Sequence, residues 1–166
     1  MRSEDDAWSL ERARAARDRR MIVHEKGPLR TVFTPRYRLL AVNSKDPRIV
    51  EGHRVACEAL RRMNIRAREA GIRFVVALIP TKERVFATHA GSVDEAFDRQ
   101  VAEERAWNEK TRVYLDSLGI EYVDLLPALE AGVADDRNPY FESPDGHPDP
   151  EGHEMMARAL AGRLGP

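Results

Sequence analysis

Residues 71–83 read Gly-Ile-Arg-Phe-Val-Val-Ala-Leu-Ile-Pro-Thr-Lys-Glu, a nearly unbroken apolar run enclosed between a glycine and a proline. Consecutive β-branched and apolar residues are typical of a strand that is buried on both faces, as the strands of parallel sheets are. We therefore expect a buried parallel strand over residues 72–79. Gly71 provides the stop before it, and Pro80 ends it.

A long helix is predicted before this strand. Asp46 is a good N-cap with Pro47 in the first turn, and apolar residues recur at helical spacing until Gly71. The apolar stripe consists of Ile49, Ala56, Leu60, Met63 and Ala67. This helix has about six turns.

The same pattern is repeated after the strand. Ser92 and Glu95 match a capping box that opens a second long helix, and Gly119 ends it. Residues 120–125 follow as a second strand, and Asp149 caps a closing helix. The second helix has the apolar stripe Phe97, Val101, Tyr114, Leu115 and Leu118. The order helix, strand, helix, strand, helix predicts an α/β fold with a parallel sheet.

The N-terminal part of the chain is different in character. Ser3 can cap a charged helix that reaches about residue 20, and residues 21–23 and 31–33 are short extended candidates on either side of a Gly-Pro turn. Neither has the pattern of a core strand. We therefore divide the chain into a charged, irregular segment, 1–45, and an α/β portion, 46–166. Two parallel strands are few for a sheet, so further strands are expected from the first 45 residues or from another chain.

Composition narrows the functional classes. The 166 residues suit one domain, and a net charge of −1 gives no electrostatic case for a nucleic-acid partner. One cysteine excludes an internal disulfide, and no apolar run is long enough to span a membrane. The N-terminus has no apolar signal sequence, so we expect a cytoplasmic location by default. Charge is uneven, however, because residues 120–166 carry ten acidic and three basic side chains.

The acidic region contains the densest polar cluster, Ser143 to His153. His147, flanked by Gly146 and Pro148 with Asp145 two residues earlier, could be a general base with its orienting carboxylate. Asp-Gly and Asp-Pro are also ordinary turn and cap dipeptides, so a solvated loop remains the alternative. His153 is interpreted as a structural residue. The acidic and histidine side chains do not follow an established metal-ligand spacing, and we expect neither a metal nor a cofactor.

The run Asp145–His153, Asp-Gly-His-Pro-Asp-Pro-Glu-Gly-His, followed by an amphipathic terminal helix, resembles the last block of SGNH (GDSL-type) hydrolases. The earlier helix ending in Arg-Glu-Ala-Gly and the strand closing in Ile-Pro-Thr-Lys-Glu are also similar to that family. The resemblance covers residues 30–164. It implies a flavodoxin-like, three-layer α/β fold with a parallel sheet, incomplete in this chain. It also implies that His147 is the base and Asp145 its supporting acid.

The spacing of this pair resembles the Asp-x-His pair of alginate acetyltransferase-like members, so both hydrolysis and acyl transfer are expected options. The resemblance implies a small-molecule or glycan ester as substrate. The chain contains no Gly-Asp-Ser block, however, and no Gly-x-Asn-Asp block. Ser44 is the one serine placed between an extended segment and a helix, and it lacks the glycine of a nucleophile turn. Asn43 is a similarly weak oxyanion donor.

We therefore expect the nucleophile to come from sequence or a chain outside these residues, in a missing N-terminal half or a partner. The isolated chain is then expected to be inactive, and an exposed sheet edge could also produce a homo-oligomer. The alternative is a non-catalytic α/β interaction module that has lost the nucleophile.

Two further groups are expected to be structural. Residues 81–83 are interpreted as the solvated start of a helix, with substrate contact as the alternative. His53 and Cys57 are four residues apart, and a packed helix face explains them better than a catalytic pair.

Overall fold

A computed structural model of the chain describes residues 20–165. The helix predicted from Ser3 lies outside these residues, apart from its expected end. The strands are β1 (Ile22–Lys26), β2 (Leu29–Phe33), β3 (Val75–Leu78) and β4 (Glu121–Asp124). The helices are α2 (Pro35–Val42), α3 (Pro47–Glu69), α4 (Lys82–Ala90), α5 (Glu95–Ser117), α6 (Leu126–Ala134) and α7 (Pro150–Leu164).

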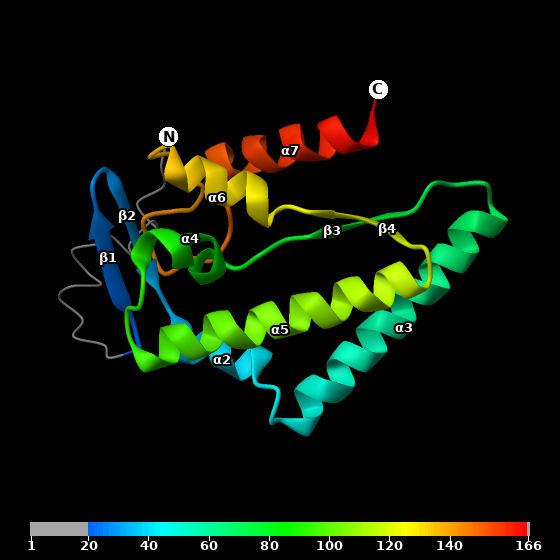
Figure 1. The fold of residues 1–166 in the computed structure, drawn as a ribbon, viewed down its shortest axis with the longest axis horizontal. Coiled ribbons are helices and arrows are strands. Elements are labelled where there is room, and N and C mark those ends of the chain that lie inside the picture. Colours follow the sequence, from blue (N-terminus) through cyan, green and yellow to red (C-terminus); the bar gives the residue numbers. More distant parts are fainter. Residues whose placement is uncertain (1–19, 166) are drawn as a thin grey trace, which may run out of the picture.

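The central layer is a parallel pair of strands, β3 and β4, in which Val75 lies opposite Glu121 and Leu78 opposite Asp124. Helices α6 and α7 lie on one side of this pair and α3 and α5 on the other (Figure 1). The fold is therefore α/β in three layers, as predicted, with a small parallel sheet. Each parallel strand is followed by a helix at its carboxyl end, which is where sites collect in such folds.

The prediction of a strand buried on both faces over residues 72–79 is wrong. The strand covers only Val75–Leu78, whose side chains are half-buried except for the exposed Ala77. Ile72 and Ile79, at the two ends of the run, are 62% and 60% exposed. The physical reason is that β3 has one hydrogen-bonded neighbour among the described strands, so one edge and part of its surface have no covering element.

Helix ends follow the sequence signals in most cases. The Asp46 carboxylate accepts the N–H of Arg48 at the start of α3, as predicted, and Asp149 caps α7 by accepting the N–H of Gly152. The prediction of a capping box formed by Ser92 and Glu95 is wrong. Asp94 is the N-cap of α5, because its carboxylate accepts the N–H of Phe97 at 2.8 Å. The Ser92 hydroxyl instead donates to the Asp98 carboxylate at 2.5 Å.

The hydrophobic core extends into the N-terminal hairpin. Strands β1 and β2 pair antiparallel around the turn at Gly27, and Val32 and Phe33 are fully buried. The expectation that residues 31–33 are not a core strand is therefore wrong. The Phe33 ring lies 4.9 Å from the ring of Phe97 on α5 and 5.8 Å from that of Phe86 on α4. This tertiary contact, which local sequence cannot indicate, makes β2 part of the core.

Helix α3 is the least covered long element. Its buried residues are Cys57 and Asn64, whereas Met63 of the predicted apolar stripe is 54% exposed. None of the helices between residues 20 and 165 is both long enough and apolar enough to cross a membrane.

Gly152, at the start of α7, lies close to the backbone of the preceding loop, so a substitution there tests this packing. A Cβ at Gly152 would lie 2.1 Å from the carbonyl oxygen of Pro139, which is backbone and cannot move aside cheaply. We expect Gly152→Ala to lower the free energy of unfolding by about 2 kcal/mol, because overpacking displaces this segment.

Gly162→Ala in the same helix is the matched control, since nothing lies within 4 Å of a Cβ there. This variant should raise the free energy of unfolding by roughly 0.5 kcal/mol, because alanine has a higher helix propensity than glycine. Urea unfolding measures both variants, and equal effects at the two positions would contradict the packing described here.

Candidate active site

Asp145 and His147 are directly paired in the loop that leads into α7. The Nδ1 of His147 lies 2.6 Å from Oδ1 of Asp145, and the backbone N–H of His147 donates to the same oxygen at 2.9 Å. With the ring proton on Nδ1, this bond leaves Nε2 as the basic nitrogen. The His147 side chain is 86% exposed and that of Asp145 is 47% exposed. The imidazole of His147 is therefore oriented by Asp145 and open to solvent.

The electrostatics of the pair favour the ionised carboxylate. Burial alone would raise the pKa of Asp145, but the two hydrogen bonds from His147 and the positive charges of His147 and Lys82 outweigh it. The pKa of Asp145 consequently lies below its ordinary value. A charged acceptor for the imidazole N–H is thus maintained at neutral pH.

Both ends of the loop are fastened near the carboxyl end of β3. The hydroxyl of the buried Tyr140 donates to the carbonyl of Pro80, two residues after β3, at 3.0 Å. Tyr140 also forms an isolated β-bridge with Pro148. Asp149 then caps α7, so the segment between Tyr140 and Asp149 has little freedom at either end.

The middle of the loop is held by Lys82, the first residue of α4. Its side-chain amine donates to the carbonyl of Ser143 at 2.6 Å and to that of Asp145 at 2.7 Å. Lys82 is only 1% exposed, and burial lowers its pKa to about 8 although Glu83 and Asp145 oppose this shift. The prediction that residues 81–83 form a solvated helix start is therefore wrong. Lys82 is buried under the loop, and Glu83 is buried where it accepts the N–H of Thr34.

A buried polar network joins the start of α4 to neighbouring elements. The Thr81 N–H donates to Glu104 of α5 at 2.8 Å, and the Thr81 hydroxyl donates to the same carboxylate. Burial raises the pKa of Glu104 despite these hydrogen bonds. The carboxylate of Glu83 accepts the N–H of Thr34 at 2.8 Å, which links α4 to the turn after β2. The turn that presents Lys82 is thus fixed from two sides.

A family model described as SGNH hydrolase-like domain, acetyltransferase AlgX, matches residues 43–165. The chain belongs to this family. The match confirms the resemblance found in the sequence, and it includes the Asp145–His147 loop and α7. No match was found among curated proteins or among solved structures.

In this SGNH hydrolase-like domain, the two weak nucleophile-site candidates are bonded to α5. The Ser44 N–H donates to the carboxylate of Glu103 at 3.1 Å, and the Asn43 side chain accepts from Arg99 at 3.1 Å. Neither has a hydrogen bond to the Asp145–His147 loop among the described residues. The structure therefore does not bring Ser44 or Asn43 together with His147 by direct contact.

The environment of Cys57 disfavours a catalytic role for the His53–Cys57 pair. The Sγ of Cys57 lies 3.7 Å from Nε2 of His53, and burial raises the pKa of the thiol, which disfavours a reactive thiolate. His153 is exposed on the first turn of α7. Within residues 20–165, no group of three or more His, Cys, Asp or Glu side chains is arranged to hold a metal ion.

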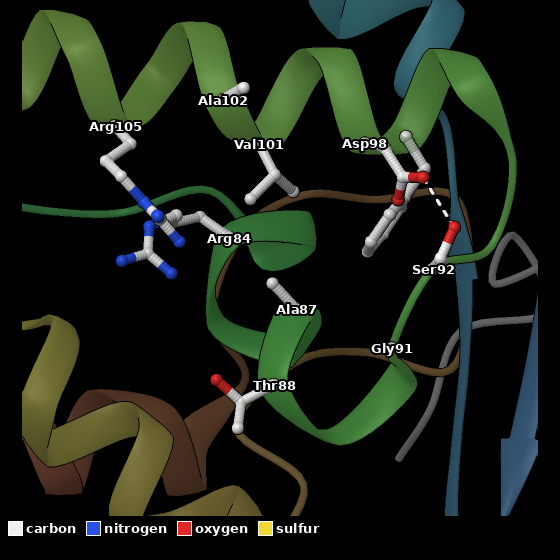
Figure 2. A pocket seen from close by; sticks show the side chains of 10 residues that line it. Arg84, Ala87, Thr88, Gly91, Ser92, Asp98, Val101, Ala102 and Arg105 are labelled. Carbon is white, nitrogen blue, oxygen red and sulfur yellow. Dashed lines mark hydrogen bonds between the residues drawn. The ribbon is translucent and has the colours of Figure 1, made fainter.

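A separate pocket lies between α4 and α5, with a volume of about 410 Å³ (Figure 2). Arg84 and Arg105 line one end, and Ser92 and Asp98, joined by their hydrogen bond, line the other. None of the lining residues belongs to the loop that contains His147. This pocket is therefore distinct from the candidate active site.

The burial of Lys82 predicts a specific pH dependence of stability. Its pKa is about 8 in the folded chain and near 10.5 when exposed, so the unfolded chain binds more protons between these values. We expect the free energy of unfolding to rise by roughly 2 to 3 kcal/mol from pH 7.5 to pH 10. Lys82→Met should remove this rise.

Lys110→Met is the matched control, because Lys110 is an exposed lysine on α5 and its removal should leave the rise intact. Urea unfolding at several pH values provides the measurement. The same slope in Lys82→Met and the unsubstituted chain would show that Lys82 is not buried as an amine.

Proposed function

We propose that this SGNH hydrolase-like domain takes part in O-acyl ester chemistry, with His147 as general base and Asp145 as the carboxylate that orients it. The observation that carries the proposal is the 2.6 Å contact between the two side chains, in a loop held at the carboxyl end of β3. The family match supports acyl chemistry, since its description names an acetyltransferase. Small-molecule or glycan esters are the proposed substrates.

In the proposed reaction, Nε2 of His147 takes the proton of a serine hydroxyl while the serine oxygen attacks the acyl carbonyl carbon. The resulting tetrahedral oxyanion collapses and breaks the bond to the alcohol oxygen, which receives the proton from His147. Water then removes the acyl group in hydrolysis, or a second hydroxyl removes it in transfer. In both cases His147 accepts the proton of the incoming nucleophile and returns it to the serine oxygen.

The serine in this proposal comes from outside residues 20–165. No serine or threonine hydroxyl within that range is hydrogen-bonded to His147, whose side-chain partner is Asp145. Without that serine the chain is expected to be inactive in the two-step reaction, and any residual rate would come from His147 acting directly on an activated ester or on water.

Hydrolysis of p-nitrophenyl acetate by the chain tests this role. We expect His147→Ala to reduce the rate to the uncatalysed background, and Asp145→Asn to reduce it by roughly tenfold because the imidazole loses its charged acceptor. His153→Ala is the matched control, since His153 is also exposed and lies six residues further along, and it should leave the rate unchanged.

Identical rates in the unsubstituted chain and His147→Ala would exclude catalysis by this chain alone. The second candidate function, a non-catalytic α/β interaction module, would then be favoured. The observation that supports that alternative is the one noted above, namely that no described hydroxyl is bonded to His147.

A further inference from the structure

Arg38 of α2 reaches the candidate active site from an element that precedes the matched family segment. Its guanidinium group packs against Gly146, the residue between Asp145 and His147. A Cβ at position 146 would lie 1.7 Å from Nη2 of Arg38 and 2.6 Å from its Cζ. Only glycine at this position allows the guanidinium group to approach the loop so closely.

Within the described residues, the guanidinium group of Arg38 takes part in no hydrogen bond or ion pair, and its Nε is buried without an acceptor. By contrast, Arg137 near the start of α7 pairs with Glu151 at 2.7 Å. An unpaired buried N–H is unfavourable, and a guanidinium group with free donors is a receptor for an anion.

Among the described residues, no carboxylate of the loop is hydrogen-bonded or ion-paired to Arg38. The bonded oxygen of the Asp145 carboxylate faces His147, and the carbonyl groups of Ser143 and Asp145 accept from Lys82. Two cationic side chains, Arg38 and Lys82, therefore approach the part of the loop in which Oδ1 of Asp145 is bonded to His147. Lys82 is used to hold the loop, whereas the donors of Arg38 stay available.

We propose that Arg38 is the anion-binding residue of the site and holds the oxygens of the acyl group beside His147. The inference rests on the proposed function, which places the ester beside His147. It adds the residue that would bind the negative charge of the acyl oxygens. The guanidinium donors can form two parallel hydrogen bonds to a carboxylate, or one or two to the oxyanion formed when the acyl carbonyl is attacked. The ligand class is therefore a carboxylate or a carboxyl-derived oxyanion.

Acetate is a suitable probe, because it carries the same pair of oxygens and needs no nucleophile. We expect the backbone amide resonances of Gly146 and His147 in the ¹⁵N-labelled chain to shift saturably as sodium acetate replaces sodium chloride at constant ionic strength. Arg38→Met should raise the acetate Kd at least tenfold. Arg38→Lys keeps the charge but loses the planar pair of donors, and it should give an intermediate Kd.

Two further variants separate anion binding from folding. Gly146→Ala should weaken acetate binding as much as Arg38→Met, because the new methyl group displaces the guanidinium group of Arg38. The urea midpoint of Gly146→Ala should change little, because the displaced arginine side chain is flexible. Arg68→Met, at an exposed arginine on α3, should leave the Kd unchanged.

Absence of saturable shifts in the unsubstituted chain, or a Kd in Arg38→Met within twofold of it, would overturn the inference. The ester assay distinguishes this result from failure of the proposed function. If the ester rate depends on His147 but the acetate Kd is the same with and without Arg38, only the role of Arg38 is rejected. If the acetate Kd depends on Arg38 but the ester rate does not depend on His147, only the catalytic role of His147 is rejected.

Discussion

The buried amine of Lys82 is the interaction on which the candidate active site depends. Its two hydrogen bonds, to the carbonyl groups of Ser143 and Asp145, join the first turn of α4 to a loop more than 60 residues later in the chain. Burial of an amine is costly and lowers the pKa of Lys82 to about 8, and the two hydrogen bonds together with the charges of Glu83 and Asp145 offset part of that cost. The position of the Asp145–His147 pair is therefore coupled to the packing of α4.

The packing of α4 depends in turn on buried polar contacts as much as on the apolar core. Glu104 binds the backbone and hydroxyl of Thr81, and Glu83 binds the backbone of Thr34. Around them, Phe33, Phe86 and Phe97 form the aromatic part of the core. The hairpin, α4 and α5 are consequently held as one unit, and the loop with His147 closes over it.

The charges around the loop have different tasks in the arrangement that we propose. Asp145 orients the imidazole, Lys82 holds the backbone, and Arg38, which is unpaired within residues 20–165, is a second cation beside the loop. A base next to a guanidinium group suits acyl chemistry, in which negative charge develops on the carbonyl oxygen. The glycine between Asp145 and His147 makes this proximity sterically allowed.

The sequence by itself determined the helix caps at Asp46 and Asp149, the alternation of the long helices α3 and α5 with the strands β3 and β4, and the local Asp145–His147 pair, because these depend on residues close together in the chain. It could not reveal that Lys82 and Glu83 are buried, that Phe33 is in the core, or that Arg38 meets Gly146. Charged residues at a helix start are solvated by default, and only a distant segment folding over them changes that. The tertiary structure decided these points because each depends on contacts between residues far apart in the chain.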